Sequence, residues 1–140
     1  MSRFSAHGSF RVHSEGPLVI VHAEGPFNLE FTESFAPVAA EFIERMRGAP
    51  WGVLVVARGD FLLTPEAEAA MHQAEVDYED GGRRVTAFVI ADGEWNAIAR
   101  GQWARVYRDN ARQPRFFASE NQARDWLLGE LGDLDGSESA

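Results

Sequence analysis

Residues 51–71, "WGVLVVARGDFLLTPEAEAAM", decide the fold class of this chain of 140 residues. The first part, Trp51–Gly59, is an apolar run rich in β-branched residues, which is typical of a strand buried on both faces. Thr64, Pro65 and Glu66 then supply a hydroxyl cap, a proline in the first turn and an acid near the amino end of a helix. A buried strand that leads directly into a helix predicts an α/β fold.

The same alternation continues on both sides of this stretch. Further strands are predicted at Ser9–His13, Leu18–Gly25, Arg83–Gly93 and Pro114–Ser119, and helices at Phe31–Gly48, Thr64–Asp80, Glu94–Asn110 and Ser119–Leu131. The order β-β-α-β-α-β-α-β-α predicts a mostly parallel five-stranded sheet packed against four helices, with an antiparallel edge strand from the opening hairpin. We expect one domain at residues 8–131 and a disordered acidic tail at 132–140.

Apolar spacing within three of the helices predicts which side chains face the core. The predicted core positions are Phe35, Val38, Ala39, Phe42, Ile43 and Met46, then Trp95, Ile98, Ala99, Trp103 and Val106, and finally Ala123, Trp126, Leu127 and Leu131. Pro37 is expected in the first turn of its helix, because only there does its missing N–H leave the hydrogen bonding intact.

Composition excludes several classes of function. The chain has no cysteine, and all 13 basic residues are arginine, so thiolate chemistry and lysine-dependent chemistry are excluded. A net charge of −9 argues against binding to nucleic acid or to an anionic membrane surface. No apolar run is long enough for a signal peptide or for a membrane span, and no nucleotide-binding loop is present. We therefore expect a cytoplasmic protein without a cofactor and without membrane insertion.

Three segments carry a resemblance to a known family. They are the opening hairpin that meets a helix after "AEGPFN" (23–28), the segment "RVTAFVIADGEWNAIARGQWARVY" (84–107) and the segment "PRFFASENQARDWL" (114–127). This pattern, from Ser9 to Leu131, resembles the sulfate transporter and anti-sigma factor antagonist (STAS) family, particularly its stand-alone bacterial branch. The resemblance implies a STAS fold and a regulatory role through protein contacts.

In anti-sigma factor antagonists, an Asp-Ser-Ser-Gly turn after the third strand starts the next helix, and a serine there is phosphorylated to switch the binding of a kinase partner. Aligned on Gly59, the four positions hold Thr64, Pro65, Glu66 and Ala67 in this chain. The phosphorylatable serine is therefore missing. We interpret Thr64 and Glu66 as a helix cap and a dipole-stabilising acid. The alternatives are that Glu66 mimics a phosphoserine or that Thr64 is itself phosphorylated.

Three large apolar residues, Phe61 to Leu63, occupy a turn where polar residues are expected. They either fold under the sheet or line a pocket or contact patch at the carboxyl ends of the strands, where open α/β sheets bind ligands. Two further turns at that edge combine an aromatic residue with polar groups. The candidate binding residues are Glu24, Phe27, Asn28, Phe61, Leu62, Leu63, Thr64, Glu66, Asp92 and Trp95.

Charge is unevenly distributed along the chain. Residues 60–80 contain seven acids and no arginine, whereas residues 97–116 contain five arginines and one acid. These segments are either solvated helix faces or complementary surfaces on neighbouring helices or in a dimer. His72 lies one turn from Glu68 and from Glu75, but the spacing matches no metal-binding motif, so we assign no metal site.

We assign no catalytic residue, because no nucleophile, base and oxyanion site converge in the sequence. The sequence favours a non-catalytic regulatory or protein-interaction module of STAS type, whose partner is another protein or a second copy of the chain. The alternative is a carrier or sensor of a small apolar, lipid-like ligand, held in a pocket at the carboxyl ends of the strands.

Overall fold

The computed structural model describes residues 8–78, 81–91 and 93–139. Its elements are β1 (Ser9–Glu15), β2 (Leu18–Glu24), α1 (Leu29–Met46), β3 (Trp51–Arg58), α2 (Pro65–Asp77), β4 (Arg83–Val89), α3 (Glu94–Val106), β5 (Arg115–Phe117) and α4 (Glu120–Ser139). The strands form one sheet in the order β1-β2-β3-β4-β5; β1 is antiparallel to β2 and the other pairs are parallel. This confirms the predicted fold class.

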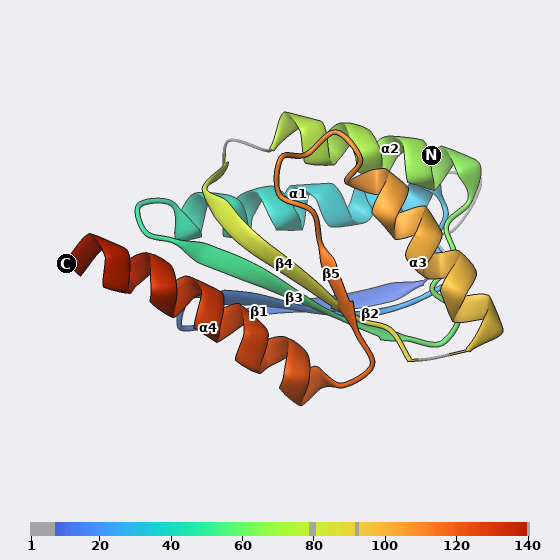
Figure 1. Ribbon diagram of the computed structural model, residues 1–140. Helices are drawn as coiled ribbons and strands as arrows, with labels where there is room; N and C mark the ends of the chain where they lie inside the picture. The colour runs from blue at the N-terminus through green and yellow to red at the C-terminus, as the bar shows by residue number, and fades with distance from the viewer. Residues whose placement is uncertain (1–7, 79–80, 92, 140) are drawn as a thin grey trace.

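Helices cover both faces of the sheet. Figure 1 shows α1, α2 and α3 on one face and α4 on the other. Side chains alternate along β2, so Val19 and Val21 pack with the three-helix side, whereas Leu18 and Ile20 pack with α4. The strand is buried on both faces because each face meets its own layer of helices, as its unbroken apolar run predicts.

Helix α1 begins earlier than predicted. The side chain of Asn28 caps it by accepting a hydrogen bond from the Phe31 amide at 3.0 Å. Pro37 therefore lies inside the helix, and its expected place in the first turn is wrong. Its side chain is exposed, so the carbonyl that lacks a helical partner faces the solvent side. Phe31, in the first turn, is buried.

The predicted core face of α3 needs one correction. Ala99, Trp103 and Val106 are buried, but Ile98 is half exposed, at 50%. The large ring of Trp103 packs between Phe61 and Phe88 and sets the rotation of the helix, which turns Ile98 outward.

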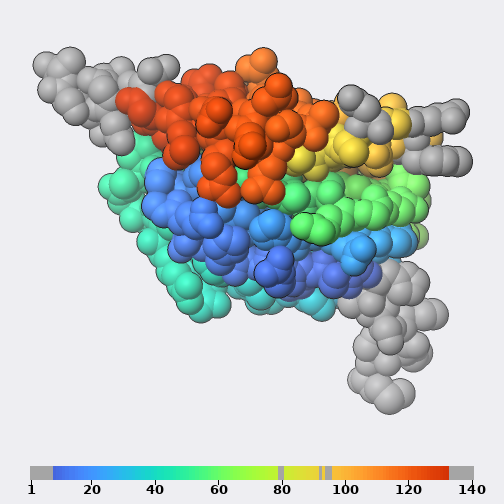
Figure 2. Space-filling view, turned by 90° about the horizontal axis from the view of Figure 1, so that it is seen from below, coloured from blue at the N-terminus to red at the C-terminus, as the bar shows by residue number. Residues whose placement is uncertain are grey.

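Helix α4 lies on the face opposite to the other helices, and its predicted core residues Ala123, Leu127 and Leu131 are buried. The helix runs to Ser139. Figure 2 shows this face, with the opening hairpin in blue beside α4 in red. In the described part of the chain, no helix has the length and apolar character needed to cross a membrane.

Candidate functional site

The turn between β3 and α2 faces inward. Phe61 and Leu63 are 1% and 4% exposed, and Leu62 is half-buried. The amide of Phe27 donates to the Leu62 carbonyl at 2.9 Å, and the amide of Thr64 donates to the Phe27 carbonyl at 3.0 Å. These bonds form a short parallel bridge between Phe27 and Leu63 that extends the pairing of β2 and β3. The three apolar residues therefore belong to the core instead of forming an exposed contact patch.

Side chains from α3 hold the same turn from above. The amide group of Gln102 accepts from the Leu63 amide at 2.9 Å and donates to the Leu63 carbonyl at 3.0 Å. The indole Nε1 of Trp103 donates to the Phe61 carbonyl at 3.0 Å. Backbone groups that a buried turn leaves without ladder partners thus find them on a neighbouring helix.

A glycine allows two turns to approach each other. A Cβ atom on Gly25 would lie 1.9 Å from the carbonyl oxygen of Asp60, far inside contact distance. The turn after β2 can therefore pass the turn after β3 only with glycine at this position.

Near the two inward-facing turns, the structure contains a cavity of about 100 Å³ between the sheet and helices α1, α2 and α3. The sheet and its turns contribute Val12, Val19, Val21, Ala23, Phe27, Trp51, Val53, Val55, Phe61, Arg83 and Phe88, and the helices and their ends contribute Phe31, Phe35, Ala36, Ala39, Phe42, Ile43, Met71, Ala74, Glu75, Tyr78, Trp103 and Tyr107. Most of these side chains are apolar, so the cavity suits an apolar occupant.

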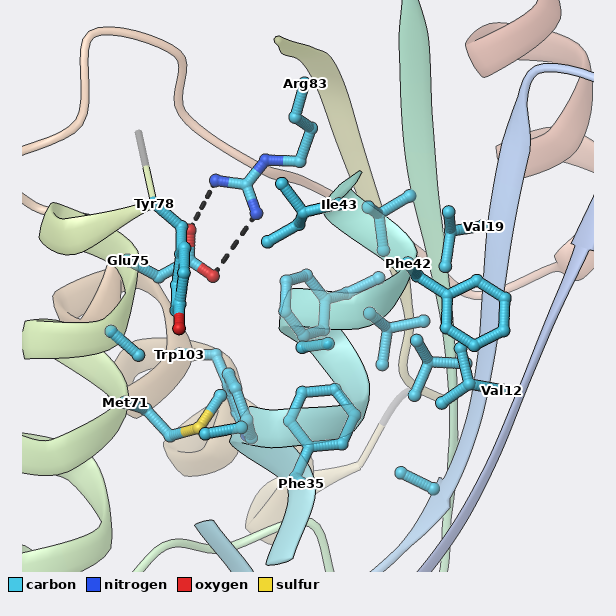
Figure 3. A pocket seen from close by; sticks show the side chains of 18 of the residues that line it. Val12, Val19, Phe35, Phe42, Ile43, Met71, Glu75, Tyr78, Arg83 and Trp103 are labelled. Atoms are coloured by element: carbon cyan, nitrogen blue, oxygen red, sulfur yellow. Dashed lines mark hydrogen bonds and ion pairs between the residues drawn. The ribbon is translucent and has the colours of Figure 1, made fainter. Parts of the chain in front are cut away.

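The polar end of the cavity is formed by Glu75 and Arg83, which point toward each other in Figure 3. Arg83 donates from both terminal nitrogens, and its Nη1 lies 3.2 Å from Oε2 of Glu75. The guanidinium also lies over the ring of Tyr107, with its carbon 5.3 Å from the ring centroid. Burial, followed by the negative charge of Glu75, raises the pKa of the Tyr107 phenol far above its ordinary value. This hydroxyl therefore stays protonated.

The cavity differs in place from the predicted pocket. It includes Phe27 and Phe61 near the carboxyl ends of β2 and β3, but it runs along the sheet beneath α1. Its charged pair lies at the other edge, where Arg83 starts β4. The prediction missed this because it considered only the turns at the carboxyl ends of the strands, and a cavity between layers depends on how α1 packs over the sheet.

The spacing of residues along α2 indicates that Glu75 faces the core. Ala67 and Met71 are buried on α2, and Glu75 follows them at the same four-residue spacing. This spacing puts Glu75 on the inner face of the helix, although Asp77, two residues later, is exposed. A carboxylate on an inner face requires a partner, and the next arginine in the sequence is Arg83.

The predicted site residues do not converge on one centre. Phe27 and Phe61 line the cavity, and Leu62 and Leu63 form the bridge to the preceding turn. Of the polar candidates, Glu24 and Glu66 are exposed, and Asn28 and Thr64 cap α1 and α2. Asp92 and the side chain of Trp95 lie outside the described part of the structure. The polar candidates therefore act mainly at helix ends.

The opposite charges of α2 and α3 meet within the chain. Arg105 donates two hydrogen bonds of 2.9 and 3.2 Å to the carboxylate of Glu68. Nε2 of His72 lies 2.7 Å from Oδ2 of Asp109. The interpretation as complementary surfaces on neighbouring helices is confirmed for these pairs. Among the described residues, no group of three or more His, Cys, Asp or Glu side chains is placed to hold a metal ion.

No family model and no curated protein matches this chain. A solved structure does: an uncharacterized protein of the DUF3478 family with a SpoIIAA-like fold, from Shewanella loihica PV-4. The TM-score is 0.61 at 17% sequence identity, and the match covers 91% of this chain and 98% of that chain. The fold is SpoIIAA-like. The predicted STAS-like fold is confirmed, and at this identity the likeness concerns the fold alone.

In this SpoIIAA-like fold, the turn into α2 is the place to which the STAS resemblance assigns the phosphorylated serine. The hydroxyl oxygen of Thr64 accepts a hydrogen bond from the Ala67 amide at 3.1 Å, so it caps the helix as predicted. Pro65 and Glu66 are exposed in the first turn. The geometry agrees with a structural cap.

Proposed function

We propose that this protein is a non-catalytic module of STAS type that binds a small apolar molecule in the cavity between the sheet and helices α1 and α2. The observation that carries the proposal is the cavity itself, a void lined mainly by valine, alanine and phenylalanine side chains. Protein interiors are normally packed as densely as organic crystals and contain few voids larger than a water molecule. A void of this size is therefore a candidate binding site.

The energy of the void supports the same proposal. At about 24 cal/mol per Å³, a cavity of about 100 Å³ corresponds to roughly 2 kcal/mol of lost stability. Four alanines line the cavity, and larger side chains at positions such as Ala39 would fill it. An apolar ligand would recover the lost contacts, because each wall atom gains a neighbour.

The size of the cavity favours a compact ligand. An engineered protein cavity of about 150 Å³ lined by apolar side chains stays dry and takes up benzene. The cavity here is somewhat smaller, at about 100 Å³. A whole lipid tail would require α1 to move away from the sheet, whereas a molecule near the size of benzene requires only small side-chain adjustments. The alternative interpretation of the sequence named a lipid-like ligand, and this proposal replaces it with a smaller one.

A native mass spectrum of freshly purified protein tests the proposal first. Extra mass that survives gentle desalting and disappears on denaturation would identify a bound ligand and its class. A titration with benzene, followed by NMR shifts of the methyl groups of Val53 and Val55, tests an empty preparation. Shifts at these methyl groups that saturate support the proposal. A preparation that carries no ligand and shows no such shifts contradicts it.

A second candidate function is the binding of a protein partner or of a second copy at the amino end of α2. The exposed carboxylate of Glu66 favours it, because it stands near the position of the family's regulatory serine. Native mass spectra also test this candidate. A bare dimer that dissociates in the Glu66→Arg variant supports self-association through this end. A protein that stays monomeric at all concentrations contradicts self-association. The candidate partner is then a different protein, which can be sought with Thr64 phosphorylated and unphosphorylated.

A further inference from the structure

The cavity combines an apolar body with one polar end. Of the described residues that line it, only Glu75 and Arg83 carry charge. The two indole groups in the wall already have partners, since Trp51 donates to the Gly81 carbonyl at 3.1 Å and Trp103 donates to the Phe61 carbonyl. A ligand's polar group would therefore meet the Glu75–Arg83 pair and the two tyrosines that also line the cavity, Tyr78 and Tyr107.

The charged pair is largely withdrawn from water. The side chains of Arg83 and Glu75 are 18% and 13% exposed, and they form two parallel hydrogen bonds. Asn110 adds a longer contact, with its Nδ2 at 3.4 Å from Oε1 of Glu75. In a site with little water, two opposite charges held this closely are strongly coupled, and breaking them apart leaves an uncompensated charge. The two charges that line the cavity in the described part of the chain are therefore opposite and paired.

We infer that this cavity selects uncharged molecules, namely compact apolar compounds that carry a single hydroxyl, carbonyl or amide group, and that Glu75 is the residue that excludes anions. This inference rests on the proposed function, because it assigns the class of ligand to the same cavity. An uncharged group adds no charge beside the pair, so it can lie against Glu75 and Arg83 without separating the two ions.

A carboxylate ligand would meet a different environment. Its negative charge would lie beside that of Glu75, and the guanidinium that could compensate it is already engaged in two bonds. It would also lose its hydration on entering the apolar part of the cavity. A cationic ligand meets the opposite problem at Arg83. Both kinds of ion are therefore disfavoured relative to a neutral molecule of the same shape.

Isobutyramide and isobutyrate test this inference because they have nearly the same shape and differ in charge. Dissociation constants are measured at pH 7 from the NMR shifts of the Val53 and Val55 methyl groups, with benzene as an uncharged reference. We expect the amide to bind about tenfold or more tightly than the carboxylate, the factor that 1.4 kcal/mol of discrimination produces. This comparison uses the unmodified protein and needs no variant.

The Glu75→Gln variant tests the assigned residue. It keeps the size of the side chain and removes the negative charge that repels an anion, so we expect the tenfold preference for isobutyramide over isobutyrate to disappear. The Glu68→Gln variant is the matched control. It removes another carboxylate of α2 that is paired with an arginine, Arg105, but does not line the cavity, so it should keep the preference of the unmodified protein.

The outcomes separate the two proposals. If benzene does not bind, the proposed ligand-binding function fails and takes this inference with it. If benzene binds and isobutyrate binds the unmodified protein as tightly as isobutyramide does, the cavity remains a ligand site and the inference about charge is overturned. The inference is also overturned if Glu75→Gln and Glu68→Gln change the preference equally, because net charge instead of the cavity pair would then be responsible.

Discussion

The two faces of the sheet are packed in different ways. On one face a single helix, α4, covers β2, β3 and β4 with aliphatic side chains, and Leu54, Ala87, Ala123 and Leu127 there have no exposed surface. On the other face three helices meet the sheet through a cluster of aromatic rings, and a cavity of about 100 Å³ remains. None of the residues of the α4 cluster lines that cavity. One face of the sheet thus packs through an aliphatic cluster beneath α4, and the other leaves a cavity.

The difference follows from the shapes of the side chains. Leucine, valine and alanine fill the space between one helix and a flat sheet without gaps. The rings of Phe27, Phe61 and Trp103 contact one another with centroids 4.8 to 6.1 Å apart; Phe61 stacks on Trp103, and Phe27 meets both edge to face. Rigid rings keep a cavity open, because they cannot bend to fill it. The two faces therefore differ in packing, and the aromatic face is the one that carries the proposed ligand site.

The largest expected effect is on the stability of the α4 face. Leu127→Ala removes a side chain with no exposed surface and should lower the free energy of unfolding by about 2–5 kcal/mol, measured by chemical denaturation. The change lies outside the cavity, so the benzene affinity of the folded protein should stay the same. If the benzene affinity changed strongly, the α4 face and the aromatic face would not be independent, and the contrast between them would fail.

A smaller effect is expected where the aromatic face is tied to its turn. Gln102→Leu leaves the amide and the carbonyl of Leu63 without their partners and should lower the free energy of unfolding by about 1–3 kcal/mol. Gln73→Leu is the control, since that amide binds only Asp77 on the exposed side of α2, and it should change stability by less than about 0.5 kcal/mol. Equal effects of the two variants would show that water replaces the partners of Leu63.

The cavity itself should respond in binding more than in stability. Ala74→Leu places a larger side chain into the cavity from α2, so the free energy of unfolding should change by about 1 kcal/mol or less while benzene binding is lost. Ala69→Leu makes the same substitution on the exposed side of the same helix and should leave binding intact. Benzene shifts that persist in Ala74→Leu would place the binding site elsewhere.

The sequence predicted the fold better than it predicted the site, for physical reasons. Strands buried on two faces and the Thr64-Pro65 helix start are local signals, and the structure confirms both. The inward-facing Phe61 also follows from the cost of exposing a large apolar side chain in a turn. The Glu75–Arg83 pair depends on the relative placement of α2 and β4, and the cavity depends on the distance of α1 from the sheet. Neither the placement of α2 relative to β4 nor the distance of α1 from the sheet can be predicted from a short sequence pattern.

The smallest expected effect concerns pH and the uncovered margin of the α4 face. His22 lies there on β2. Burial, followed by the positive charge of Arg11, lowers the pKa of its imidazole below the ordinary value of 6.5. Glu120 raises this pKa, whereas His13 and Arg58 lower it further. The folded state therefore holds the neutral ring, and the unfolded state takes up a proton first as the pH falls. The stability contributed by neutral His22 is fully present above pH 6.5 and is lost as the pH falls toward the pKa of the folded state.

The His22→Gln variant isolates this contribution from other titrating groups, because Glu15, whose pKa is lowered mainly by its hydrogen bond with Arg124, also loses stabilising interactions in acid. Denaturation midpoints at pH 7.5 and pH 5.5 should show a smaller loss in the variant than in the unmodified protein. An NMR titration in which the His22 ring takes up its proton at or above pH 6.5 would contradict the prediction. Benzene affinity should not follow this titration, since His22 and the cavity lie on opposite faces of the sheet.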